Sequence, residues 1–163
     1  MKYVNFCLIV IITFALSAGS VNTRVPYEGY YPGEMIPNIV LTDLDGNEHR
    51  LHDYKGKKVV VNFWASYDAR SRAANVRLHN ILKAMDADAV FLSVSFDENR
   101  NVVERTMALD NMETVFLFCE TSGNSSTLYK ELNLEKGFRN YLIGENGEIA
   151  AMNVNPEDLK NLF

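Results

Sequence analysis

The sequence predicts a single α/β domain built on a central sheet of mixed strand direction. The strongest signal is the apolar run V-V-V-N-F at residues 59–63, which has the length and composition of a strand covered on both faces. It passes without Gly or Pro into a helical pattern, as in a parallel β-α-β unit. The apolar residues of this helix recur at steps of three and four: Ala74, Leu78, Ile81, Leu82 and Met85. Asp-Gly and Asn-Gly turns near the two ends of the domain add antiparallel hairpins.

The other elements of the first two thirds follow from local patterns. Residues 39–42 and 47–51 flank the Asp-Gly turn and are expected to form an opening hairpin. Residues 89–95 form a second buried strand, residues 97–112 a second helix and residues 114–119 a third strand. The second helix has four main apolar positions: Val102, Val103, Met107 and Leu109.

The last part of the domain is expected to hold a short helix, a closing hairpin and a final helix. The short helix covers residues 125–132. Two polar residues are candidate caps for its start: Asn124 and Ser125. Residues 139–143 and 148–152 form the closing hairpin across the Asn-Gly turn. The final helix begins at Asn155, which is followed by a proline suited to the first turn.

The amino terminus has the composition of a targeting segment. Lys2 is followed by an apolar run and then by small residues, so residues 1–19 are interpreted as a signal peptide. Residues 20–34 are rich in Pro, Gly and Tyr and are expected to be a linker, which leaves residues 35–163 as the domain. We therefore expect a periplasmic or secreted protein, and an uncleaved amino-terminal membrane anchor is the alternative.

The charge of the chain excludes one class of partner. The 21 acidic and 16 basic residues give a net charge of −5, which does not suit a nucleic-acid-binding protein. We instead expect a protein, peptide or small ligand as partner, and contact with a membrane only through an uncleaved signal segment. No cofactor is expected.

The segment V-V-V-N-F-W-A-S-Y-D-A-R-S-R at residues 59–72 resembles the active-site segment of thioredoxin-like thiol–disulfide oxidoreductases, especially exported redoxins of the cytochrome-maturation type. Their pattern is an apolar strand, then F-W-A-(S/T)-W-C-x-x-C, then a helix. In this comparison Asp68 and Ser71 stand at the two cysteine positions, and Tyr67 at the second Trp. The resemblance implies a thioredoxin-like sandwich, with helices on both faces of the sheet and an extra amino-terminal hairpin.

A second segment extends the resemblance to the closing hairpin. In the family this hairpin follows a cis-proline that faces the cysteine pair, and the matching text here is G-F-R-N-Y-L-I-G at residues 137–144. Phe138 stands at the proline position, or Arg139 if the match shifts by one residue. A cis bond before a non-proline residue costs about 3 kcal/mol, so we expect a trans peptide.

The implied function follows from the two replaced cysteines. Hydroxyl and carboxylate oxygens cannot replace sulfur in thiol–disulfide exchange, so we expect a redox-inactive domain that binds a partner at the former active-site edge. The candidate contact residues there are Trp64, Tyr67, Asp68, Arg70, Ser71, Arg72, Phe138 and Arg139. Whether the chain is an enzyme stays open, although the missing cysteines favour a binding role.

Each of these candidates also has a purely structural interpretation. Asp68 is a suitable N-cap for the helix, and this role is favoured over ligand binding. Arg70, Arg72 and Arg77 could form a basic surface for an acidic partner, but as solvated helix charges they need no function.

The remaining thiol and the histidines are weaker candidates. Removal of the signal peptide leaves Cys119, which could act as a lone nucleophile in an alternative oxidoreductase function. Its neighbours include an acid and no base, so a buried and inert thiol is favoured. His49, His52 and His79 lack the spacing of metal ligands, and no metal site is expected.

Overall fold

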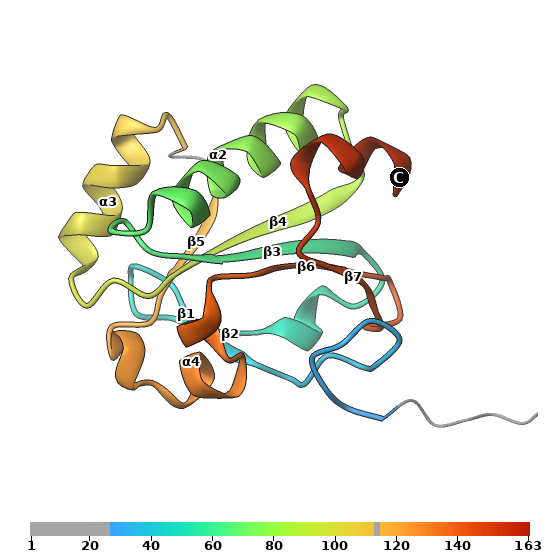
Figure 1. Ribbon diagram of the computed structural model, residues 1–163, viewed down its shortest axis with the longest axis horizontal. Coiled ribbons are helices and arrows are strands. Elements are labelled where there is room, and N and C mark those ends of the chain that lie inside the picture. The colour runs from blue at the N-terminus through green and yellow to red at the C-terminus, as the bar shows by residue number, and fades with distance from the viewer. Residues whose placement is uncertain (1–26, 113–114) are drawn as a thin grey trace, which may run out of the picture.

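A five-stranded mixed sheet in the order β5-β4-β3-β6-β7 forms the centre of the computed structural model (Figure 1). The structure describes residues 27–112 and 115–163. The strands are β3 (Lys58–Trp64), β4 (Ala89–Ser95), β5 (Phe116–Cys119), β6 (Asn140–Ile143) and β7 (Ile149–Met152). β3 and β5 run parallel to β4, whereas β6 is antiparallel to both β3 and β7. The predicted mixed sheet is confirmed.

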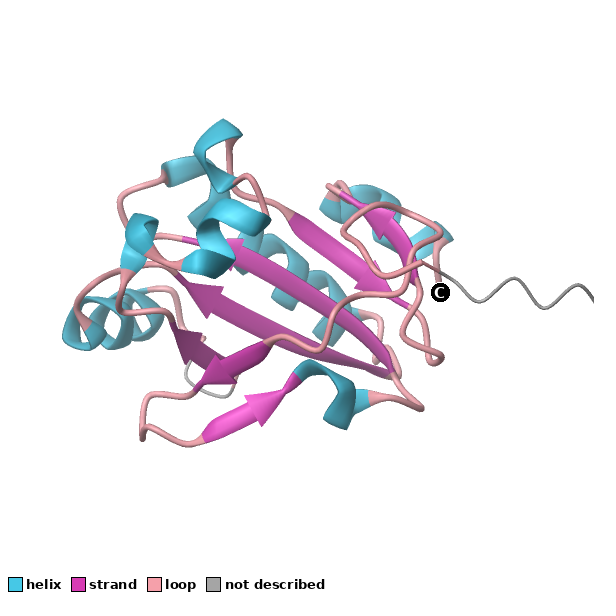
Figure 2. Cartoon of the chain, turned by 90° about the horizontal axis from the view of Figure 1, so that it is seen from below, coloured by secondary structure: helices cyan, strands magenta, loops and turns pink. Residues whose placement is uncertain are grey.

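Helices cover both faces of this sheet, as Figure 1 shows. On one face lie α2 (Ala69–Ala84), α3 (Arg100–Leu109) and the closing 3₁₀ helix Pro156–Asn161. On the other face lie α4 (Thr127–Glu131) and a hairpin of β1 (Val40–Thr42) and β2 (Glu48–Arg50). Short 3₁₀ helices complete the connections at Leu51–Tyr54, Gly123–Ser125 and Leu134–Lys136. Figure 2 shows the two-stranded hairpin outside the main sheet, next to β5.

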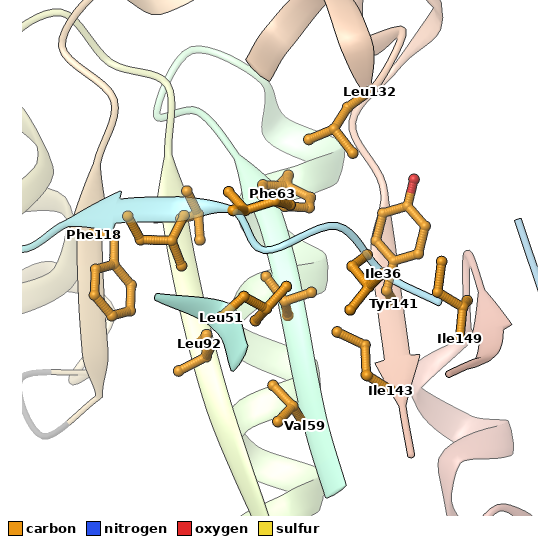
Figure 3. Packing of buried hydrophobic residues seen from close by; sticks show 14 of the residues in the cluster. Ile36, Leu51, Val59, Phe63, Leu92, Phe118, Leu132, Tyr141, Ile143 and Ile149 are labelled. Atoms are coloured by element: carbon orange, nitrogen blue, oxygen red, sulfur yellow. The ribbon is translucent and has the colours of Figure 1, made fainter. Parts of the chain in front are cut away.

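The apolar run of β3 is explained by burial on both faces. Val59, Val61 and Phe63 pack in the core on the side of the hairpin, where Figure 3 shows Val59 and Phe63 among the labelled side chains. Val60 and Trp64 point to the opposite side and pack under the helices. Because successive side chains of a strand alternate between faces, a strand covered on both sides needs apolar residues throughout.

Both predicted turns are present. Gly46 has a φ of +92° and Gly147 a φ of +89°, a conformation that glycine adopts without strain. The first turn is further fixed by Asp43, whose carboxylate accepts a hydrogen bond from the N–H of Asn47 at 2.8 Å. These turns close the β1–β2 and β6–β7 hairpins, so the predicted hairpins are confirmed.

Three details of the helices differ from the sequence predictions. The second helix begins only after Asn99, whose side chain caps it, and two of its predicted apolar positions, Val102 and Leu109, are 40% and 75% exposed. The cap of α4 is Ser126, which accepts from the N–H of Tyr129 at 3.0 Å, rather than Asn124 or Ser125. The final helix starts after Asn155 as predicted, but it is a 3₁₀ helix.

The described part of the predicted linker is attached to the domain. The N–H of Gly33 donates to the carbonyl of Ile149 at 2.9 Å, and the N–H of Ile36 to that of Gly147 at 3.0 Å. Gly33 and Ile36 therefore lie beside the β6–β7 turn, at the end of the sheet opposite to the carboxyl end of β3, whereas the hydroxyl of Tyr30 reaches Glu131 of α4 at 3.0 Å. The predicted signal peptide and Cys7 lie outside the described residues. Within the described residues, no helix has the length and apolar character needed to span a membrane.

Candidate functional site

The candidate site is the turn between β3 and α2. β3 ends at Trp64, three residues cross the corner, and Asp68 precedes the first residue of α2. The carboxyl ends of β4 and β5 lie along the same edge, because both strands run parallel to β3. Ligand sites of open α/β sheets are commonly built at this edge.

Asp68 and Ser71 meet in the first turn of α2. The Asp68 carboxylate accepts a hydrogen bond from the N–H of Ser71 at 2.7 Å, and the Ser71 hydroxyl donates to the carbonyl of Asp68 at 3.2 Å. Ser71 is buried, and its hydroxyl also accepts from the N–H of Ala65 at 3.4 Å. The predicted cap is therefore present, and the two side chains satisfy backbone groups of the corner.

Trp64 supports the corner from below and has no exposed surface. Its indole N–H donates to the hydroxyl of Ser93 at 2.8 Å, and Asn75 of α2 donates to the same oxygen at 2.9 Å. The amide of Asn62 completes the network with a 3.0 Å bond to Asn75. Trp64 and Ser71 are thus inaccessible to a partner, which corrects their prediction as contact residues.

Tyr67 belongs to a cluster of aromatic rings at the mouth of the corner. Its side chain is 68% exposed, and its ring centroid lies 6.3 Å from that of Phe138. Phe138 in turn lies 6.2 Å from Tyr129 and 6.1 Å from Phe96. The sequence predicted that Tyr67 and Phe138 meet, but it did not reveal Tyr129 or Phe96.

The loop that carries Phe138 is held against β3 by the backbone. The N–H of Phe63 donates to the carbonyl of Arg139 at 2.9 Å, one residue before β6 begins. No cis peptide bond occurs within residues 27–112 and 115–163, so the predicted trans peptide at Phe138 and Arg139 is confirmed.

The predicted basic surface is only partly formed. Arg72 makes a bidentate ion pair with Asp110 of the turn after α3, with N–O distances of 2.8 and 2.7 Å. Its charge is therefore balanced within the chain, while its side chain stays partly exposed, so its assignment as a contact residue stays a prediction. Arg139 is partly buried, with its guanidinium 3.8 Å from the sulfur of Met152. Arg70 and Arg77 are exposed on α2.

A buried carboxylate, which the sequence analysis did not single out, completes the corner. Asp97 is 6% exposed and accepts from the N–H of Ser66 at 2.9 Å and from the hydroxyl of Ser95 at 2.7 Å. The Ser66 hydroxyl donates to its other oxygen. The signal in the sequence was a charged residue two positions after the end of a buried strand, at the edge where sites form.

Cys119 lies at the end of β5 on the helical side of the sheet and is 2% exposed. Its thiol donates to the backbone carbonyl of Asp97 at 3.3 Å. Burial raises the pKa of Cys119 to about 11, and the negative charge of Asp97 adds to this effect. A thiol with this pKa is protonated at neutral pH, and only the thiolate is nucleophilic. These features favour the inert interpretation.

The histidines do not approach one another as metal ligands. His49 lies 3.1 Å from a carboxylate oxygen of Asp43, and His52 lies 2.9 Å from the carbonyl of Ile36. Among the residues that the structure describes, no group of three His, Cys, Asp or Glu side chains could hold a metal ion.

Comparison with known sequences identifies the family. The AhpC/TSA family matches residues 32–152, which is most of the chain. The chain belongs to the AhpC/TSA family. The family match begins near the predicted start of the domain and includes the whole candidate corner.

Curated relatives of this AhpC/TSA protein include thiol-disulfide oxidoreductases named ResA. The ResA of Geobacillus kaustophilus is 57% identical over 35 residues, which are 22% of this chain and 20% of that protein. The ResA of Bacillus cereus is 36% identical over 70 residues, or 39% and 40% of the two chains. The chain thus covers well under half of the length of either relative.

Solved structures match more of the chain. A thioredoxin-like protein from Parabacteroides distasonis is 36% identical, with a TM-score of 0.70 over 83% of this chain and 96% of that one. The thioredoxin domain of a thiol-disulfide oxidoreductase from Bacteroides vulgatus is 23% identical, with a TM-score of 0.71 and coverage of 82% and 96%. The fold of this AhpC/TSA protein is therefore thioredoxin-like.

Proposed function

We propose that this chain is an exported, redox-inactive member of the AhpC/TSA family that binds a partner protein, peptide or small ligand at the corner between β3 and α2. The observation that carries the proposal is the hydrogen bond between the Asp68 carboxylate and the N–H of Ser71. By resemblance these residues occupy the two positions where the related oxidoreductases carry cysteines. Here the Asp68 side chain caps the helix, and the Ser71 hydroxyl is bonded to backbone groups of the corner.

The chemistry of the corner supports redox inactivity. Disulfide exchange requires a thiolate that attacks a disulfide sulfur, and a carboxylate or hydroxyl cannot form the mixed disulfide. The whole sequence contains two cysteines, Cys7 and Cys119, and therefore no C-x-x-C pair. Cys119 is buried, and its pKa of about 11 keeps it protonated.

The rigidity and exposure of the corner support a binding role. Hydrogen bonds from Trp64 and Asn75 to Ser93 fix the end of β3 and the first turns of α2 beneath the surface. Above them, Tyr67 presents a large aromatic ring to solvent. Exposed aromatic residues on a preorganised support are typical of binding hot spots, because little conformational freedom is lost on association.

The alternative is an oxidoreductase that uses Cys119 as its single thiol. The names of the ResA relatives favour this function, since they are described as thiol-disulfide oxidoreductases. The burial of Cys119 counts against it. The two functions make opposite predictions for a thiol assay.

Insulin reduction with dithiothreitol as electron source separates the two functions. We expect the native chain to give no turnover above the reagent alone. A double variant, Asp68→Cys with Ser71→Cys, supplies the matched positive control, because it places two thiols at the corner. We expect this variant to form a disulfide and to gain turnover. Turnover by the native chain that disappears in Cys119→Ser would establish the alternative.

Binding at the corner is tested by affinity capture from the exporting cell. The double variant Tyr67→Ala, Arg70→Ala is compared with the native chain, and Tyr31→Ala serves as the control because Tyr31 is also exposed but lies near the β6–β7 turn. We expect loss of partners with the corner variant only. Unchanged capture of every partner by that variant would contradict the proposed surface.

A further inference from the structure

A groove lies between Tyr67 and α4, on the side of Tyr67 away from Arg72. Its volume is about 450 Å³. We call it the acidic groove and define it by six lining residues: Tyr67, Phe96, Asp97, Glu98, Val102 and Tyr129. It joins the candidate corner to the start of α3, and it combines aromatic walls with carboxylates.

The walls of the acidic groove are aromatic and mutually supported. Phe96 packs edge-on to Tyr129, with centroids 5.6 Å apart, and Phe138 lies within 6.3 Å of both Tyr67 and Tyr129. The faces of aromatic rings carry negative partial charge and attract cations that approach within about 6 Å. Tyr67 is well exposed, so its ring is accessible from the groove.

The charge on the floor of the groove is not neutralised. Asp97 is buried, and the groups of residues 27–112 and 115–163 that donate hydrogen bonds to it are uncharged: the N–H and hydroxyl of Ser66 and the hydroxyl of Ser95. Within the part of the chain that the structure describes, the ion pairs involve Asp43 and Asp110 but not Asp97. Buried charges are usually paired, so an uncompensated carboxylate favours a cation from outside the chain.

Neighbouring groups strengthen this negative field. Glu98 is exposed and follows Asp97 directly along the groove. Partial loss of contact with water raises the pKa of the Tyr67 hydroxyl, and the negative charges of Asp97, Asp68 and Glu98 raise it further. The nearest cation in sequence is Arg100, which donates to the carbonyl of Leu44 at 3.2 Å and forms no ion pair with Asp97 or Glu98 within the described residues.

On the other side of Tyr67 the charge is balanced or positive. The depression there is lined by Arg72, which is paired with Asp110, and by Arg77, which is exposed. Tyr67 therefore separates an acidic groove from a basic one. The arginines of α2 suggest an acidic partner, but the aromatic side of the corner suits a partner of the opposite charge.

We propose that the acidic groove receives a lysine or arginine side chain of a partner polypeptide. The ammonium or guanidinium group would lie between Tyr67 and Tyr129, where it faces the aromatic rings and approaches Asp97 and Glu98. The aliphatic stem of the same side chain would contact Val102 at the rim. This proposal rests on the proposed function, since it names the chemistry of the partner at the same site.

Peptide titration monitored by ¹⁵N chemical shifts of the full chain tests the proposal. The probe is acetyl-Gly-Gly-Lys-Gly-Gly-amide, and the comparison peptides replace lysine by arginine, norleucine or glutamate. We expect saturable shifts of the amides of Ser66, Tyr67, Asp97 and Glu98 with the lysine and arginine peptides. Norleucine keeps the stem but lacks the charge, and we expect its affinity to be about tenfold lower.

Variants locate the site. Tyr67→Leu keeps an apolar side chain without the aromatic face, and Glu98→Gln removes one charge; each should weaken the lysine peptide about three- to tenfold. Glu104→Gln is the control, because Glu104 is an exposed carboxylate of α3 that does not line the groove. Equal weakening by Glu104→Gln would show general charge attraction and overturn the proposal.

The peptide titration has three further outcomes that would contradict the proposed cation site. Absence of saturable shifts in the groove, equal affinity of the norleucine peptide, or preference for the glutamate peptide would each overturn the proposal. These failures are distinct from failure of the proposed function. If the native chain reduced insulin, the proposed redox inactivity would be wrong, but the preference of the groove for lysine could still hold. If the groove showed no preference for lysine and the chain did not reduce insulin, only the proposed cation site would be wrong.

Discussion

The thiol of Cys119 donates a hydrogen bond to the backbone carbonyl of Asp97, so that the one cysteine of the described residues is joined to the corner but buried beneath it. We expect this thiol to be unreactive toward an aromatic disulfide reagent at pH 7.5 in the native protein. The variant Cys7→Ser is used so that a single thiol is measured. Addition of urea should expose Cys119 and release one equivalent of product. Rapid labelling without urea would contradict the buried geometry.

The same thiol makes stability depend on alkaline pH. Its pKa is about 11 in the folded chain, against an ordinary value of 9.0. The protonated thiol therefore contributes stability that is complete below pH 9 and is lost as the pH rises toward 11, because the unfolded chain releases the proton first. Urea unfolding at pH 8, 9.5 and 10.5 should show a steeper loss for the native chain than for Cys119→Ala. Parallel pH profiles of the two proteins would contradict this prediction.

Asp68 should stabilise the start of α2. Because its carboxylate accepts from the N–H of Ser71, Asp68→Ala leaves that group without a partner. We expect a loss of about 1 kcal/mol in the free energy of unfolding, measured by urea denaturation. Asp68→Ser retains a capping oxygen and should lose only a small part of this. If the two variants are equally destabilised, the carboxylate does not act as a cap.

The buried side-chain amide of Asn75 should contribute more to the free energy of unfolding than its small size suggests. Asn75→Ala removes one hydrogen-bond partner from each of Asn62 and Ser93, and buried polar groups that lose a partner cost about 1 to 3 kcal/mol. We expect a destabilisation of about 2 kcal/mol or more by urea denaturation. Asn80→Ala on the exposed face of the same helix is the matched control and should stay within about 0.5 kcal/mol. Similar values for both variants would show that the network contributes little.

The ion pair of Arg72 with Asp110 links the start of α2 to the turn after α3. A double-mutant cycle of Arg72→Ala and Asp110→Ala should give a coupling free energy of about 1 kcal/mol in low salt, since the pair is bidentate but partly exposed. The coupling should fall when the salt is raised to 1 M, because the Debye length then shrinks to about 3 Å. A coupling that is independent of salt would indicate packing of the arginine stem instead.

The fold could be predicted because its signals are local. The run at β3 and the periodic apolar positions of α2 indicated the β-α-β unit, and the Asp-Gly and Asn-Gly turns indicated both hairpins. The limits of α3 were wrong for a physical reason. Asp97 accepts from the N–H of Ser66 instead of capping the helix, and the side chain of Asn99, which accepts from the N–H of Asn101 at 3.0 Å, is the cap.

The candidate site could be predicted only in part because its contacts are distant in sequence. The capping role of Asp68 follows from neighbouring residues and was foreseen. The partner of Arg72 lies 38 residues away, and the ring of Tyr129 reaches Phe138 from a separate helix. Such pairings have no local signature. A polar residue inside an apolar strand, such as Asn62 or Ser93, is the signal that would have indicated the buried network.

The hydrogen bonds that hold Gly33 and Ile36 at the β6–β7 turn determine which side of the domain faces solution when the protein is attached to a surface through its amino-terminal side. Anything joined ahead of residue 27, such as an affinity tag or a coupling group for a sensor chip, meets the domain at the end of the sheet opposite to Tyr67. A surface-coupled chain would therefore present its aromatic corner to the solution. Capture from the amino-terminal side is the orientation in which a partner has the freest approach.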